Sequence, residues 1–504
     1  MHRALEILEI AEMVCCHLRP QGHCAGRTLA ALAATCTLWQ EPALDALWAT
    51  QDSLIPILSY LIFDSLQRIV RSLTLADWEP LSLYSHRVKD LSTSFECKMA
   101  EIYPMLNLCL SATALFANLR TLSWDSYEEE EFPYIRIFLT SSLSRIAFRY
   151  APSITNSSLL STLGRTCPHL TEVEITLADN ADDTDDSANA TSLFVCSLPL
   201  IESVMVPRPN WTAHKHIGQF HRLISLSMYT LPALPSVVSP PSGCAFAGPQ
   251  SLEVESADMP ETLHLLQMGK HVNLASLAVT LSEDYSAVET TKLYTTLAVT
   301  CSPISLTHLR LRLDGYYSTH LSAEYAINDN MIRSLLPFTK LATLHLTSTA
   351  LFVIHDETVL DAARAWPCLE RLTLDFMSPP LTPPPSHLTL QSLCSLAQHC
   401  SRLRSLHITI DATTIPAPPA VAITRQRELT RMCIAHSAIS QPRAVARLLS
   451  DIFPNFRHMS GSHRSPSMSA EMQATYARWD EVASLVPEFV AVRAEERARV
   501  QEGR

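Results

Sequence analysis

Apolar residues recur along this sequence in a short pattern, which is clearest at Leu403, Leu406 and Ile408. The pattern has apolar residues at positions 1, 4 and 6, and its last two alternate with polar neighbours, as in a β-strand that buries one face. Because a strand this short cannot bury its apolar face alone, its recurrence predicts stacked units that share one core. The successive copies begin at Val70, Leu119, Leu143, Leu170, Ile201, Leu223, Leu274, Leu306, Leu341, Leu369, Leu403, Leu429 and Phe456.

The spacing of the copies indicates the kind of repeat. Leu143 and Leu170 are 27 residues apart, and Leu341 and Leu369 are 28 apart. Periods of about 20–29 residues are typical of leucine-rich repeats and shorter than those of helical-pair repeats. Several intervening segments have helical patterns and end in a Cys or Pro. The sequence therefore predicts an α/β fold, a curved and irregular leucine-rich-repeat solenoid of strand–turn–helix units, with helices at 158–165, 329–336, 358–365, 390–400 and 444–453.

The beginning of the chain follows a different pattern. Residues 4–48 contain three runs with apolar residues at helical spacing. The first run includes Ile7, Ile10, Val14 and Leu18. We expect Thr28 to cap a second helix, and the dipeptide at 41–42 to open a third, since proline is best tolerated in the first turn. This predicts a separate three-helix unit ahead of the repeats.

The last of these runs reads Cys36-Thr-Leu-Trp39-Gln-Glu-Pro42-Ala-Leu44-Asp-Ala-Leu47-Trp48. At the end of three short helices, this segment resembles an F-box, and the chain as a whole is similar to fungal F-box proteins with irregular leucine-rich repeats. The resemblance implies that the helices dock on a Skp-type adaptor, which links the chain to a cullin scaffold. Seven residues are the candidate adaptor contacts, some of which must also form the core of the helical unit: Leu8, Leu18, Leu32, Trp39, Pro42, Leu47 and Trp48.

These patterns suggest three domains. Residues 1–50 form the F-box-like helical unit, 51–460 the solenoid, and 461–504 a capping helix around Trp479, Val482 and Val486 followed by a charged tail. Three insertions interrupt the solenoid. We expect the acidic segment 179–192 to be disordered, and the proline-rich segments 231–250 and 377–387 to be stiff loops.

Composition excludes several classes of function. The 504 residues are 47% hydrophobic and carry a net charge of −12, which is unfavourable for binding nucleic acid. The longest uncharged run, 231–252, contains five prolines and does not predict a membrane-spanning helix. Glu6, Glu9 and Glu12 interrupt any apolar core of a secretion signal. We therefore expect the fourteen cysteines to be unpaired in a reducing cytoplasmic or nuclear compartment.

No motif predicts catalysis, a cofactor or a metal site. Ten glycines leave no phosphate-binding loop, and no C-x-x-C or H-E-x-x-H spacing is present. We interpret the Cys/His cluster at 15–24 as structural, and His214 and His216 as part of a solvated loop beside Trp211. An enzyme would need a nucleophile and a base brought together by the fold, which this sequence does not reveal.

The preferred hypothesis is therefore a non-enzymatic adaptor of a Skp–cullin–F-box type ubiquitin ligase, with the repeats binding a protein substrate. Residues between the strand apolars, such as Arg404, Ser405 and His407, face that substrate. The alternative is a protein-interaction scaffold without a ligase link, in which the N-terminal helices only cap the repeat stack. Co-purification with a Skp-type adaptor distinguishes the two.

Overall fold

A computed structural model gives the fold of the chain, which divides into two compact units, Met1–Leu223 and Ile224–Arg504. The described residues are 7–18, 23–58, 83–93, 102–109, 115–125, 130–178, 185–229, 231, 249–268, 271–315, 324–376, 386–416, 425–434, 436–456, 458–459 and 469–502.

The first unit begins with the three predicted helices, α1 (Leu8–His17), α2 (His23–Ala33) and α3 (Thr37–Ala49). Two predicted starts were wrong. Helix α2 begins before Thr28, and α3 begins at Thr37, so that Pro42 lies inside it. The earlier start of α3 brings the side chain of Trp39 into the core of the helical unit. Proline at this position removes one backbone hydrogen bond, and burial of the Trp39 side chain opposes that cost.

The rest of the first unit consists of parallel strands with helical connections. Strand β1 follows α3 directly, and each strand pairs with the next along the chain. The strands are β1 (Thr50–Gln51), β2 (Asp90–Ser92), β3 (Thr121–Asp125), β4 (Arg145–Tyr150), β5 (Glu172–Leu177) and β6 (Ser203–Val206). The helices are α4 (Ile55–Leu58), α6 (Ile102–Cys109), η2 (Phe132–Phe138), α7 (Ile154–Thr166), α8 (Asp185–Cys196) and α9 (Trp211–Ile217).

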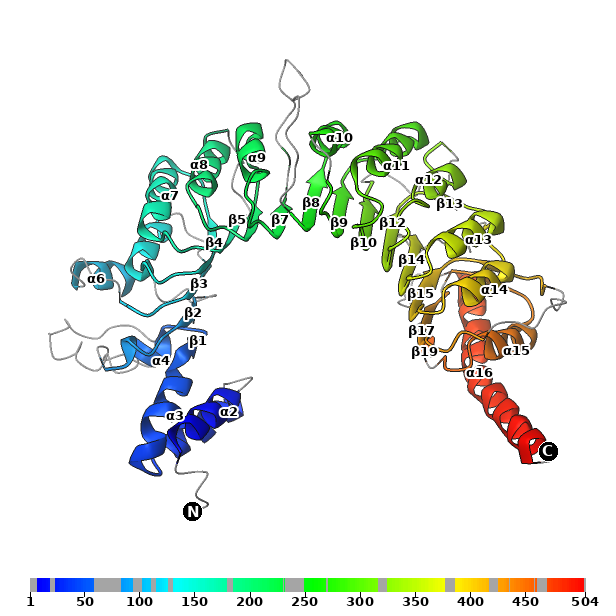
Figure 1. Cartoon of the computed structure of the whole chain (residues 1–504), viewed down its shortest axis with the longest axis horizontal. Helices are drawn as coiled ribbons and strands as arrows, with labels where there is room; N and C mark the ends of the chain where they lie inside the picture. The colour runs from blue at the N-terminus through cyan, green and yellow to red at the C-terminus, as the bar shows by residue number, and fades with distance from the viewer. Residues whose placement is uncertain are drawn as a thin grey trace. The chain divides into compact units, whose positions relative to one another are not determined.

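The second unit repeats this architecture, and helices α10–α14 lie along one side of its strands (Figure 1). Its parallel strands are β7 (Ser225–Met228), β8 (Ser251–Ala257), β9 (Ser276–Leu281), β10 (His308–Leu313), β12 (Thr343–Ser348), β14 (Arg371–Phe376), β15 (Ser405–Ile408), β17 (Arg431–Cys433) and β19 (His458–Met459). The helices are α10 (Met259–Gln267), α11 (Ala287–Thr300), α12 (Asp329–Ser334), α13 (Asp356–Ala365), α14 (Leu390–His399), α15 (Pro442–Ile452) and α16 (Ala470–Glu502).

Two short strand pairs supplement this sheet in the second unit. Strand β11 (Ile327–Asn328) pairs with β13 (Phe352–Val353), and β16 (Asp411–Ala412) pairs with β18 (Ala438–Ile439). Strands β11, β13 and β18 each lie between a sheet strand and its following helix, whereas β16 lies between β15 and β17, and each pair ties neighbouring repeats together.

The register of the strands confirms the predicted strand–turn–helix repeat. Leu344 lies opposite Leu309 and Leu372 in the neighbouring strands, and Leu346 is aligned with leucines in the same way. Leu344, Leu346 and Leu341, the first residue of the copy, are at most 1% exposed. Equivalent positions of successive copies therefore stack on one another and form a continuous apolar core within the unit.

The described part of the chain confirms each predicted copy from Leu119 onward, whereas the copy at Val70 lies outside the described residues. Besides β1 and the four strands of the short pairs, two strands of the sheet were missed, β2 and β8. In β2, Val88 and Leu91 are followed by a buried Thr93 in the third apolar position. In β8, Pro249 stands where the first apolar residue is expected, immediately after the proline-rich segment. Both sequences depart from the pattern at one of its three positions.

The acidic segment 179–192 was predicted incorrectly in its second half. Residues 185–192 belong to helix α8, whose Ser187, Ala188, Thr191 and Ser192 are buried. These small side chains let α8 pack closely on α7. The acidic residues in the first turn of α8 lie at the positive end of the helix dipole, which stabilises them. Residues 179–184, together with 232–248 and 377–385 of the proline-rich segments, lie outside the described residues.

The predicted C-terminal helix is present as α16 and is longer than the pattern indicated. Trp479, Val482 and Val486 are at most 4% exposed, as expected for a helix that covers the end of the repeats. The indole Nε1 of Trp479 donates to the carbonyl oxygen of Ser437 at 2.8 Å, and Arg493 donates to the carbonyl oxygen of Arg447 at 2.9 Å. Residues 461–468 lie outside the described residues.

We expect Leu346→Ala to lower the free energy of unfolding of the protein by about 2–5 kcal/mol, because it leaves a cavity between two stacked leucines. The matched control is Val299→Ala on α11, where the side chain is 77% exposed; its effect should stay within about 0.5 kcal/mol. Urea unfolding followed by circular dichroism measures both. Equal destabilisation by the two changes would contradict the proposed core.

Candidate functional site

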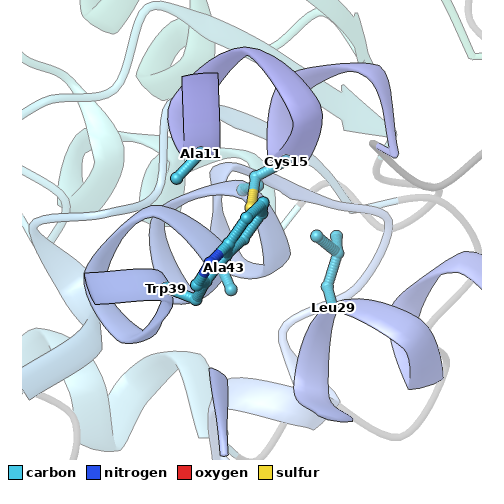
Figure 2. Close-up of a cluster of buried hydrophobic side chains, with 6 residues drawn as sticks. Ala11, Cys15, Leu29, Trp39 and Ala43 are labelled. Carbon is cyan, nitrogen blue, oxygen red and sulfur yellow. The ribbon is translucent and has the colours of Figure 1, made fainter. Parts of the chain in front are cut away.

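The N-terminal helices surround an apolar core of their own. Figure 2 shows the indole of Trp39 among Ala11, Cys15, Leu29 and Ala43, which come from all three helices. Trp39 is 6% exposed, and Ala11 and Leu29 are fully buried. Since an amphipathic helix must bury its apolar face, this core explains why α1 and α2 both pack on α3.

The seven predicted adaptor contacts separate into groups. Trp39 and Pro42 are buried within the helical unit, and this burial removes them from the set of accessible contacts. Leu18, Leu32 and Leu47 are half-buried against the same core. Leu8, at the start of α1, is 46% exposed and stays a candidate, and the structure adds the neighbouring Ile7 and Met13, which are 46% and 59% exposed.

Trp48, the seventh predicted contact, lies where the helical unit meets the first repeat. Its ring stacks on Tyr84 with the centroids 4.7 Å apart. Arg87 donates to Glu41 at 2.6 Å and also forms an ion pair with Asp45, both on α3. Together with the β1–β2 pairing, these contacts attach α3 firmly to the repeat. Trp48 therefore has a structural role at this junction, which spacing alone did not reveal.

In the second unit, the strand face opposite the helices carries a group of arginines. Strand β10 alternates exposed His308, Arg310 and Arg312 with buried leucines. Exposed arginines also begin β14 and β17. We call Arg310, Arg312, Arg371 and Arg431 the arginine strip. This strip was not predicted, although its residues occupy the outward positions of the repeat pattern and were therefore predictable from it.

Ion pairing leaves the arginine strip with an excess of positive charge. Arg312 binds Asp314 through Nε at 2.6 Å. The nearby Asp375 accepts a hydrogen bond from His407 at 3.1 Å. Arg371 and Arg431 are both opposite Ser405 on β15, so they lie two strands apart, about 10 Å. The arginine strip is therefore a local surface with several positive charges on a chain whose net charge is −12.

Three histidines beside the strip differ in their protonation. Burial lowers the pKa of His345, and the positive charge of Arg310 lowers it further. Burial likewise lowers the pKa of His436. Burial also opposes the charge on His407, but hydrogen bonds to Asp375 and to the Cys433 side chain outweigh it and raise the pKa to about 10. At neutral pH, His407 is therefore the charged member of the three.

The sequence reading of His214 was wrong. Residues 211–217 form helix α9, not a loop, and His214 is fully buried with Nδ1 3.0 Å from the carbonyl oxygen of Asn210. In the Cys/His cluster at 15–24, Cys15 is in the core and the His17 ring lies 2.8 Å from the Met13 carbonyl oxygen. Within the described ranges, no group of three His, Cys, Asp or Glu side chains converges as a metal site would.

None of the helices in the described residues combines the length and the apolar character that crossing a bilayer demands.

No protein-family model matches this chain, and no curated protein matches it. Among solved structures, it is similar to the yeast complex of Rad7 and Elc1, with 12% identity, a TM-score of 0.34, and coverage of 89% of this chain and 98% of the other. A Bacteroides fragilis protein matches at 10% identity and a TM-score of 0.27, covering 70% and 77%. The LRIM1/APL1C complex matches at 13% identity and a TM-score of 0.27, covering 83% and 63%.

The protonation of His407 is testable by NMR. Because its folded pKa is raised to about 10, above the value of about 6.5 for an unperturbed imidazole, the stabilisation it supplies is present below pH 6.5 and is lost as pH rises through 10. We expect the His407 ring nitrogens to show the imidazolium signature at pH 8, and Asp375→Asn to lower the titration midpoint. A wild-type midpoint below 7 would contradict the arrangement.

Proposed function

We propose that this chain is the substrate-binding adaptor of a Skp–cullin–F-box type ubiquitin ligase. In this role, the N-terminal helices dock on a Skp-type adaptor and the repeats bind a protein substrate. The observation that carries the proposal is that the apolar side chains of α1 and of the residue before it fall into two sets. Ala11 and Cys15 are buried in the core of the helical unit, whereas Ile7, Leu8 and Met13 are exposed and belong to no core in the described residues.

The firm attachment of α3 to the first repeat supports the same function. An adaptor of this kind performs no chemistry and acts by holding its substrate at high local concentration beside the transferred ubiquitin. A stiff connection favours this effect, since a loosely joined helical unit would spread the substrate over a larger volume. The Trp48–Tyr84 stack and the pairing of Arg87 with Glu41 supply that stiffness within the first unit.

The arginine strip indicates the class of substrate. Guanidinium groups bind carboxylates and phosphates through paired hydrogen bonds, and a cluster of them attracts anionic partners over distances of several ångströms. We therefore propose that the substrate presents an acidic segment to β10–β17.

The second candidate is a repeat scaffold without a ligase link, in which the helices are only a cap. The direct continuation of α3 into β1 favours it, because a capping element is expected to lead into the terminal strand.

We expect the double change Leu8→Asp and Met13→Asp to weaken binding of the full-length chain to a purified Skp-type adaptor by at least about tenfold, since two exposed apolar contacts become charged. The control Leu108→Asp alters a side chain on α6 that is 82% exposed. It should leave binding and stability unchanged. Pull-down and calorimetry measure the effect. If the wild-type chain does not bind the adaptor, the ligase proposal is wrong and the capping alternative stands.

The substrate class is tested with an Asp/Glu-rich peptide. Charge reversal by Arg310→Glu with Arg371→Glu should weaken its binding by about tenfold or more at low salt, and the wild-type affinity should fall as salt rises. Arg364→Glu, an exposed arginine on α13 in the same unit, is the matched control. Equal losses in both variants would show that only net charge matters and would exclude the strip as the binding surface.

A further inference from the structure

Three chemically reactive side chains lie together on the exposed strand face of the second unit. In the sheet register, His407 of β15 is directly opposite Cys433 of β17. On its other side it is opposite Thr373 of β14, and Asp375 follows two residues later on the same face. His407 donates from Nε2 to Oδ1 of Asp375 at 3.1 Å, and the same ring is hydrogen-bonded to the Cys433 side chain. A nucleophile, a base and an orienting carboxylate are thus in contact.

Cys433 differs in its surroundings from the cysteines that directly follow helices α7, α11 and α14. Cys167, Cys301 and Cys400 are at most 3% exposed, and burial raises the pKa of each to about 12, so they are inert. Cys433 is half-buried, with one side against Met472 and Tyr476 of α16. The side chains of His407 and Asp375 are 29% and 26% exposed, so small solutes reach this group from the open face.

We propose that Cys433 is held as a nucleophilic thiolate by His407 and Asp375 and is a site of modification by hydroperoxides. The His407 imidazolium supplies the charge that stabilises the sulfur anion, and Asp375 fixes the ring and keeps it protonated. His407 and Asp375 act as positioning residues for the thiolate. The proposal is independent of the adaptor function, because it concerns the chemistry of one strand face and requires no ligase partner.

The other titratable groups around the thiol leave this assignment intact. His345 on β12 and His436 after β17 both have lowered pKa values and are neutral at pH 7. The Tyr476 hydroxyl on α16 lies 3.2 Å from Nδ1 of His436 and is engaged there. Arg310 and Arg312 on β10 add positive charge to the same face, which favours an anion. The imidazolium beside Cys433 is therefore that of His407.

The reaction is a two-electron oxidation. The thiolate sulfur of Cys433 attacks the distal oxygen of the hydroperoxide, a sulfur–oxygen bond forms, and the oxygen–oxygen bond breaks. The sulfur becomes a sulfenic acid, and the leaving hydroxide or alkoxide takes a proton from the His407 imidazolium to give water or an alcohol. The products are a sulfenic acid and a neutral imidazole, so the ion pair on this face is lost while its net charge stays the same.

The thiolate is tested in the full-length protein with iodoacetamide, by measuring alkylation of individual cysteines by peptide mass spectrometry. Cys368, which is also half-buried in this unit, is the internal control. We expect Cys433 to react at least about tenfold faster than Cys368 at pH 7 and at a rate nearly constant from pH 6 to 8. In His407→Gln and in Asp375→Asn, the alkylation of Cys433 should be slower, and its rate should rise with pH as it does for an ordinary thiol. The alkylation rate of Cys368 should stay unchanged.

Hydrogen peroxide with a sulfenic-acid trap supplies the second measurement. Labelling should concentrate on Cys433 in the wild-type protein and fall about tenfold or more in His407→Gln, at an unchanged circular dichroism spectrum. The proposal is overturned if Cys433 alkylates no faster than Cys368 with the same pH slope, or if peroxide labels the two cysteines equally. Adaptor binding by the same samples shows separately whether the proposed ligase function holds.

Discussion

The structure depends on one repeated backbone contact. The carbonyl oxygen of Ala342 accepts hydrogen bonds from the amides of Glu370 and Arg371, at 2.8 and 3.0 Å. The carbonyl oxygens of Thr307, Glu370 and Arg404 likewise accept hydrogen bonds from two consecutive amides of the next copy. Each acceptor follows the first leucine of its copy. Because this contact recurs between successive copies from β2 to β6 and from β7 to β17, the strands of each unit enter the sheet in one register, and the buried apolar residues of their copies then align.

That constraint explains what could be predicted of the fold. Each copy needs only one short segment in a fixed conformation, and that segment is the apolar pattern that the sequence displays. Before several copies, a buried helix C-cap three residues ahead of the first apolar position completes the turn, as at Cys167, Trp366 and Cys400. The connecting segments lack this constraint, so helices α8, α10 and α11 can differ in length and composition. These helices therefore could not be predicted from the repeat pattern.

The candidate site was less predictable, for two physical reasons. In the N-terminal helices, apolar residues occur on more than one face, so spacing could not separate Trp39, which is core, from Leu8, which is exposed. On the strands, the candidate chemistry depends on contacts between residues many positions apart. The repeat pattern does place His407 and Cys433 at the same position of successive copies, so their adjacency was available from the sequence, whereas the hydrogen bond from His407 to Asp375 was not.

The exposed strand face of the second unit carries both the arginine strip and the proposed thiolate of Cys433. Its arginines sit at outward positions because the inward ones must be apolar, and the same alternation places His407 and Cys433 outward beside them. An acidic chain gains selectivity from such a face, since its remaining surface repels anionic partners and the strip attracts them. The thiolate of Cys433 and the imidazolium of His407 form an ion pair on this face, and oxidation replaces that pair by a neutral sulfenic acid and a neutral imidazole. The net charge of the face is therefore the same in both states of Cys433, and the arginine strip keeps its attraction for an acidic partner.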